Sequence, residues 1–123
     1  MGKFVIKGVS TGKAFRLDAA NGVTIATSEV YSSLDACKKG IESVRANALA
    51  HVEDQTVEGY ESLTHPKYEI YQDKAGEYRF RLKASNGQNI AASQGYSRKD
   101  SCKEGIASVG KNAPDAPVEF EEK

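Results

Sequence analysis

The best candidates for a chemical role in this sequence are three basic side chains at alternate positions, Arg79, Arg81 and Lys83. They alternate with aromatic and aliphatic residues, so a strand here would place the cations on one face and the apolar side chains on the other. Cations spaced about 7 Å apart along a strand match the scale of successive phosphates. Two interpretations stay open: a candidate anion-binding face for RNA or single-stranded nucleic acid, or a solvated sheet face.

The other residues that could do chemistry lack the spacing that catalytic or metal sites require. His51 and His65 are the only histidines, and neither lies near a cysteine in the sequence. Cys37 and Cys102 occupy apolar positions of two expected helices, which favours small buried side chains over reactive thiols. No serine lies in a nucleophile motif. We therefore expect no catalytic, metal-binding or cofactor-binding residues.

The chain contains two copies of one unit. The segment FRLDAANGVTIATSEVYSSLDACKKGIESVRANA, from Phe15, matches FRLKASNGQNIAASQGYSRKDSCKEGIASVGKNA, from Phe80. About 20 of 34 aligned positions are identical at a constant shift, which indicates a tandem repeat.

Each copy has the pattern β-β-β-α-β. In the first copy, alternating apolar residues predict strands over 3–7, 14–20 and 23–27. Asn21-Gly22 lies between the last two and predicts a type I′ hairpin turn. The segments HVEDQ and PVEFE, which follow the two helical segments, predict a fourth strand in each copy.

Between the third and fourth strands the apolar period becomes helical. An apolar stripe runs from Cys37 to Val44, Ser32 predicts the N-cap, and Asn47 predicts a left-handed C-terminal residue. Gly40 within the stripe predicts that the helix lies close to the sheet. The equivalent residues in the second copy are Ser97, Cys102, Gly105, Val109 and Asn112.

The length favours two units that share one core. A unit of about 50 residues is near the lower limit for independent folding. We expect 1–123 to form a single domain, with repeat one over about 3–55, a linker over 56–66 and repeat two over about 67–121. A joined sheet removes two strand edges, so we expect an antiparallel sheet with both helices on one face and a monomer with internal pseudo-two-fold symmetry.

The composition excludes partners that need a strong overall charge. Seventeen basic and seventeen acidic residues cancel, so only local patches could attract nucleic acid or an anionic membrane. No apolar run reaches the roughly 20 residues of a membrane helix, and the N-terminal segment turns polar too early for a signal peptide. We expect a cytoplasmic protein that does not associate with a membrane.

The second copy also resembles a known domain. The run G-E-Y-R-F-R-L-K-A-S-N-G, the G-Y-S before the helix, and the C-x-x-G-I-x-S-V helix that ends in K-N-A-P-D-A are similar to the YegP-like domain, a bacterial domain of unknown function often found in tandem. The resemblance is very close over Lys67 to Ala116 and more divergent over Lys3 to Ala48. It implies an α+β fold of β(3)-α-β units in a single sheet, with the last strands exchanged between units.

The resemblance assigns no activity, so the expected function comes from the residues. We expect a non-enzymatic binding or interaction module that uses the outer sheet face. An anionic macromolecule is the partner that the basic residues suggest. The alternatives are nucleic-acid binding through those residues and a small enzyme whose site forms at the repeat interface.

Overall fold

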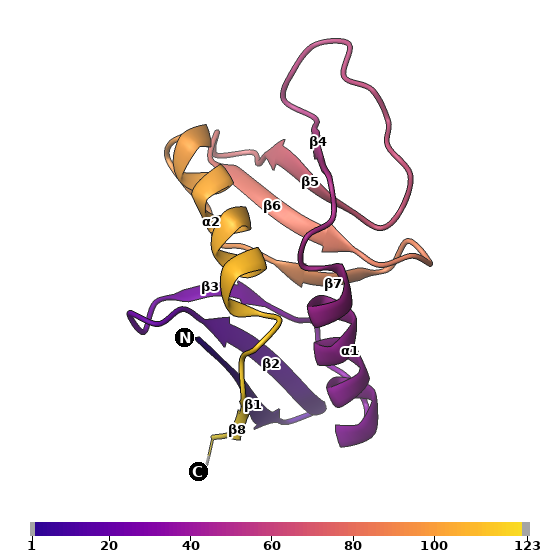
Figure 1. Ribbon diagram of the computed structural model, residues 1–123, viewed down its shortest axis with the longest axis vertical. Coiled ribbons are helices and arrows are strands. Elements are labelled where there is room, and N and C mark those ends of the chain that lie inside the picture. The colour runs from indigo at the N-terminus through magenta and orange to yellow at the C-terminus, as the bar shows by residue number, and fades with distance from the viewer. Residues whose placement is uncertain (1, 122–123) are drawn as a thin grey trace.

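The computed structural model describes residues 2–121, which form one sheet with both helices on one of its faces (Figure 1). The strands are β1 (Lys3–Val9), β2 (Gly12–Asp18), β3 (Thr24–Thr27), β4 (Val52–Asp54), β5 (Lys67–Gln72), β6 (Tyr78–Lys83), β7 (Asn89–Ala92) and β8 (Val118–Phe120), and the helices are α1 (Leu34–Asn47) and α2 (Lys99–Asn112). Within residues 2–121, neither helix is long and apolar enough to cross a membrane.

The sheet exchanges its last strands between the two copies. Its strand order is β4-β5-β6-β7-β3-β2-β1-β8. β4 of the first copy therefore pairs with β5 of the second, and β8 of the second pairs with β1 of the first. This confirms the predicted α+β fold and the strand exchange. The sheet is mixed rather than wholly antiparallel, because each helix carries the chain across to the far edge, where the last strand runs parallel to its neighbour.

The two halves meet at a narrow seam. β3 and β7 pair at one position only, Thr27 with Ala92. Each helix also spans the seam, because α1 contacts β2 and β7 while α2 contacts β6 and β3. Helix packing and strand exchange thus join the halves more extensively than the central strand pair does.

Strand alternation places the predicted apolar residues in the core. Phe80 and Leu82 on β6 are buried beneath α2, as Phe15 and Leu17 on β2 are beneath α1. A Cβ atom at Gly105 would lie 2.6 Å from Tyr96 Oη and 3.0 Å from the Phe80 ring. The glycine therefore permits the close approach of helix and sheet that the sequence predicts.

The hairpin turn differs from the prediction. Gly22 has φ +87°, but no non-glycine residue among 2–121 has a positive φ, so the predicted type I′ turn was wrong. The Gly22 N–H donates to Ala19 O (2.9 Å), and the Ala19 N–H donates to Val23 O (2.8 Å). These bonds describe a type I turn followed by a glycine bulge.

The predicted N-caps of the two helices and the predicted left-handed end of α1 were also wrong. The N-cap of α1 is Ser33, whose Oγ accepts from the Ala36 N–H (3.1 Å), and not Ser32. The N-cap of α2 is Arg98 rather than Ser97, and its side chain makes no capping hydrogen bond. Asn47 is not left-handed: its amide donates to Ser43 O (2.9 Å) within the helix.

Candidate functional site

The predicted basic residues lie on the sheet face opposite the helices, here called the outer face. Arg79, Arg81 and Lys83 alternate along β6 with Phe80 and Leu82, which are buried on the helix side. The orientation follows from strand alternation, as the sequence predicts. What the sequence pattern did not reveal is which acidic side chains surround them.

Arg79 is engaged by a carboxylate from the turn after β5. Its Nε donates to Asp73 Oδ2 (2.7 Å), and a second guanidinium nitrogen donates to Ser93 O (3.4 Å). The hydrogen bond from Arg79 lowers the pKa of Asp73, and the bond to Asp73 raises the pKa of Arg79. This side chain is thus fixed in position, with its charge locally balanced.

Arg81 is held between an acid and an aromatic ring. Its Nε donates to Glu69 Oε1 (2.6 Å), and its guanidinium lies over the Tyr71 ring, 4.3 Å from the ring centroid. Glu69 and Tyr71 both come from β5, beside β6 in the sheet. Stacking and ion pairing restrict the guanidinium to one orientation while leaving it partly exposed.

Lys83 differs from the two arginines. It lies opposite Lys67 in the β5–β6 ladder, and among residues 2–121 it forms no ion pair. Its ammonium is therefore the most available of the three predicted cations.

A buried ion-pair cluster lies beside this face, and the sequence pattern missed it. The Lys67 ammonium lies 2.6 Å from Glu53 Oε1 and 3.1 Å from Glu69 Oε2. The connecting segment, residues 55–66, closes over the cluster, since the Leu63 N–H donates to Glu53 Oε1 (2.7 Å) and Gln55 Nε2 to Glu53 Oε2 (2.6 Å). Only the exchange of β4 brings Glu53 here, so no local sequence signal predicts the pair.

The contacts within the cluster shift the pKa values of Glu53 and Lys67. Burial by itself raises the pKa of Glu53, but hydrogen bonds from Gln55 and Lys67 outweigh it and lower the pKa to about 2. The hydrogen bond to Glu53 raises the pKa of Lys67 in turn. These groups stay charged at neutral pH, and Glu69 links the cluster to Arg81 on the outer face.

The outer face of the first half carries a different set of side chains. Val5 stands where the second half has Glu69, and Asp18 stands where it has Lys83. Arg16, the counterpart of Arg81, pairs with Asp18 (3.2 Å) and Glu121 (2.9 Å). The two halves therefore do not present the same surface.

His51 contacts the connecting segment, which includes His65, and both cysteines lie in the core. His51 Nε2 is 2.7 Å from Thr64 O in the connecting segment, and the His65 ring lies near Gly87. Cys37 and Cys102 are unbridged and buried, and burial raises the pKa of both thiols. Among residues 2–121, no group of three His, Cys, Asp or Glu residues could hold a metal ion.

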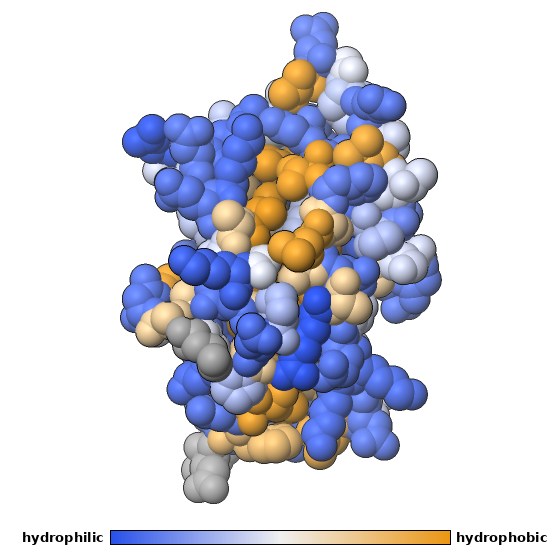
Figure 2. Space-filling model, in the orientation of Figure 1, coloured by the Kyte–Doolittle hydropathy of each residue, from blue (hydrophilic) through white to orange (hydrophobic). Residues whose placement is uncertain are grey.

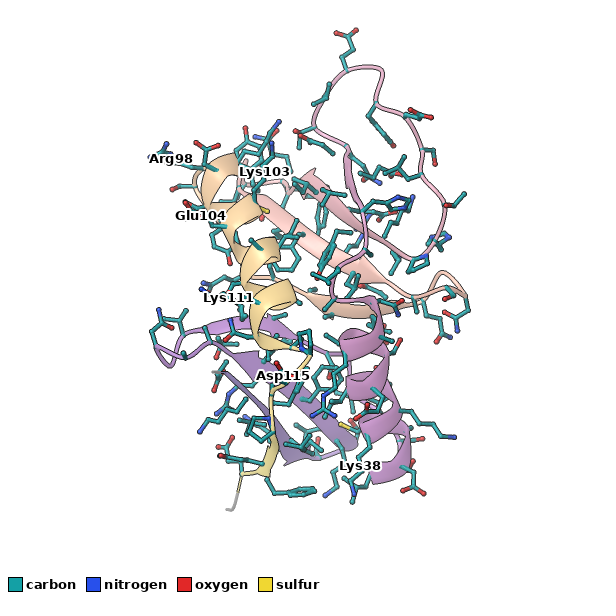
Figure 3. All side chains as sticks on the ribbon, in the orientation of Figure 1. Lys38, Arg98, Lys103, Glu104, Lys111 and Asp115 are labelled. Carbon is teal, nitrogen blue, oxygen red and sulfur yellow. The ribbon has the colours of Figure 1, made fainter. Side chains whose placement is uncertain are left out.

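Residues of the described part of the chain form an apolar hollow and a more polar one on the helix face. An apolar one of about 380 Å³ lies between the helices beside Leu49 and Ile106, where Figure 2 shows an exposed hydrophobic patch. A polar one of about 500 Å³ lies between the β2–β3 turn and the end of α2, near Lys111 and Asp115 (Figure 3). Ser108 lines the polar hollow, but its Oγ is bonded to the Asn112 amide (3.1 Å) and no histidine lies there. Neither hollow pairs a nucleophile with a base.

Comparisons with known proteins agree with this architecture. Residues 12–54 and 73–119 match the family described as Domain of unknown function (DUF1508). A UPF0339 protein of Stutzerimonas stutzeri is 67% identical over 48 residues, which span 39% of this chain and 43% of that protein. UPF0339 protein PA0329 of Pseudomonas aeruginosa is 35% identical over 120 residues, 97% of this chain and 96% of that one.

A solved structure extends the match to the fold. The solution NMR structure of the protein of unknown function yegP from E. coli superimposes with a TM-score of 0.78 at 36% identity, covering 98% of this chain and 92% of that one. The matched repeats, the full-length relative and the shared fold together show that this chain belongs to the DUF1508 (UPF0339) family, whose function is unknown.

Proposed function

We propose that this chain is a non-enzymatic binding module whose outer sheet face, in the second half, holds another protein. The observation that carries the proposal is the Arg81–Tyr71 stack, anchored by Glu69 on a sheet face that no helix covers. Arginine and tyrosine are enriched among residues that dominate protein–protein binding energy. Because adjacent strands already fix both side chains, binding would lose little side-chain entropy.

The charge pattern favours a protein over nucleic acid. Carboxylates of Glu69 and Asp73 alternate with the guanidinium groups of Arg81 and Arg79, so the face presents both signs of charge. A polyanion would have to compete with these acids for each arginine, whereas a protein surface can offer complementary charges of both signs. Within residues 2–121, the strands of this half present Tyr71 on the outer face and no exposed aromatic row of the kind typical of single-strand binding.

A site-specific cross-linker tests this proposal. Benzoylphenylalanine at Lys83 is expected to form discrete adducts with protein in an extract of the source cells, and Tyr71→Ala with Arg81→Ala is expected to abolish them. The matched control carries the same probe at Lys103, which projects from α2 on the helix face (Figure 3). The proposal fails if both positions give the same adducts, if the Tyr71 and Arg81 changes leave them intact, or if position 83 gives none.

Nucleic-acid binding is the second candidate, and it is favoured by Lys83, whose ammonium forms no ion pair within residues 2–121. If Arg79, Arg81 and Lys83 each contact a phosphate, the log–log dependence of affinity on salt should have a slope of at most about −2 to −3. Fluorescence anisotropy of a labelled single strand measures it, and replacement of all three by Gln should abolish binding. Binding that is independent of salt, or none at low salt, removes this candidate.

A further inference from the structure

The outer face of the first half contains a small hollow beside Arg16. Its volume is about 220 Å³, and residues of β1, β2 and the end of β3 line it. Val5, Val9 and Ala14 give it an apolar floor, while Lys7 and Arg16 bring two positive charges. Among the described residues 2–121, no acidic side chain belongs to the lining. The hollow therefore combines an apolar surface with basic groups.

The second half places an aromatic ring at the equivalent position. The β1–β2 and β5–β6 ladders have the same register, so Arg16 corresponds to Arg81. By the same register, Lys7 corresponds to Tyr71. The Arg81 guanidinium lies over the Tyr71 ring, 4.3 Å from the ring centroid. Because a lysine replaces this tyrosine in the first half, the Arg16 guanidinium has no aromatic partner within residues 2–121.

Arg16 is nevertheless held in a fixed orientation. Its Nε donates to Asp18 Oδ2 (3.2 Å), and a second guanidinium nitrogen donates to Glu121 Oε1 (2.9 Å). The N–H bonds of a guanidinium lie in its plane, so these contacts leave its flat faces available for stacking. Arg81 shows the same combination, since its Nε is bound to a carboxylate while its face lies over Tyr71. Arg16 thus presents one half of a stack whose ring is missing.

Lys7 adds a charge that no carboxylate neutralises. Its side chain is exposed and forms no ion pair within residues 2–121. Opposite it in the ladder lies Ala14, where the second half has the much larger Arg79. The small side chain of Ala14 leaves space between the ammonium and the guanidinium, so an anionic group could reach Lys7 from a ring stacked on Arg16.

We propose that this hollow binds a small aromatic carboxylate. The ring of the ligand stacks on the Arg16 guanidinium, as the Tyr71 ring does on that of Arg81. The carboxylate of the ligand accepts a charge-assisted hydrogen bond from the Lys7 ammonium. The site belongs to the first half and needs no partner on the Arg81–Tyr71 surface, so the inference stands apart from the proposed function.

Titration of the ¹⁵N-labelled protein with benzoate tests the site. Benzoate should give saturable NMR shifts centred on the amides of 5–9, 14–16 and 27–28. Cyclohexanecarboxylate has the same charge without an aromatic ring, and it should bind about threefold or more weakly, the scale of an exposed cation–π contact. Lys7→Gln should weaken benzoate binding by about the same factor, because it removes an exposed ion pair.

Lys7→Tyr is the decisive variant, because it gives the first half the residue that the second half has at Tyr71. The new ring should stack on Arg16 and fill the hollow, so benzoate should no longer bind, whereas Lys7→Gln leaves the hollow open. The matched control is Lys13→Gln, since Lys13 is also a lysine of this strand pair but lies on the helix side and does not line the hollow. It should leave benzoate binding unchanged.

Three results would overturn the proposal. The first is the absence of a saturable benzoate shift up to about 100 mM. The second is cyclohexanecarboxylate binding as tight as that of benzoate, which would exclude stacking on Arg16. The third is undiminished binding in Lys7→Gln, or any remaining binding in Lys7→Tyr, because either would place the ligand outside this hollow.

Discussion

The Lys67 ammonium lies 2.6 Å from Glu53 Oε1, and the two side chains are only 6% and 2% exposed. In the other half the equivalent pair, Lys3 with Glu119, lies 3.2 Å apart with side chains 44% and 55% exposed. The same ion pair of the repeat is therefore buried at one edge of the sheet and solvated at the other. The segment 55–66 explains the difference, because its Leu63 N–H closes over the buried pair.

Removing the buried carboxylate should destabilise the protein far more than removing its exposed counterpart. Glu53→Gln leaves the buried Lys67 ammonium with Glu69 as its remaining partner, and we expect a loss on the order of 3 kcal/mol in the free energy of unfolding. Glu119→Gln, the matched control, should cost under about 1 kcal/mol. Urea denaturation measures both, and equal losses would contradict the assignment.

Stability should also fall in acid because of Glu53. Its pKa is lowered in the folded protein from 4.5 to about 2, so the folded state binds this proton less readily than the unfolded state does. The stabilisation is present above the ordinary pKa and is lost as the pH falls from about 4.5 towards 2. Unfolding free energies measured across this range should show a weaker pH dependence in Glu53→Gln; an unchanged slope would show that other acids dominate.

Alanine at Gly40 in α1 or at Gly105 in α2 should destabilise the fold, although alanine is normally the better helix former. At Gly105 the added Cβ would lie 2.6 Å from Tyr96 Oη, and at Gly40 it would clash with Tyr31 Oη. Overpacking of this kind costs about 1–3 kcal/mol, which outweighs a helix-propensity gain of up to about 1 kcal/mol. Gly110→Ala is the control and should cost less, since its nearest contact, at 2.9 Å, is the end of the exposed Leu49 side chain, which can move, and the next is Ala48 O at 3.3 Å. Thermal melts distinguish the three variants.

Both cysteines should stay reduced and unreactive in the folded protein. Burial raises the pKa of Cys102 to about 11 and also raises that of Cys37, so the thiolate form is scarce at neutral pH. A thiol reagent should react slowly with the native protein and should find two free groups after denaturation without reductant. Rapid labelling of the native protein, or fewer than two groups after denaturation, would contradict this.

The protein should be a monomer in solution. Each half receives its last strand from the other half of the same chain, so the exchange needs no second chain. Sedimentation equilibrium should give a mass near 13.3 kDa. A stable species of twice that mass, with strands exchanged between two chains, would contradict the prediction of a monomer.

The tandem repeat and the local structure of each unit follow from the sequence by itself. The period-two alternation around Phe80 and the helical stripe at Cys102 are local patterns, and both predict which side chains are buried. The outward direction of Arg79 and Arg81 follows from the same alternation. Turn and cap details, such as Ser33 in place of Ser32, depend on small backbone differences that these patterns do not resolve.

The tertiary structure decided which charges and acceptors meet. Glu53 lies 14 residues before Lys67 and reaches it only because β4 crosses to the second half. Sequence periodicity reports on neighbours within one strand or helix, whereas these contacts depend on strand order and on how closely two halves pair. The periodicity of the sequence thus indicates the individual strands and helices, while the exchange of β4 and β8 decides which side chains meet between the two repeats.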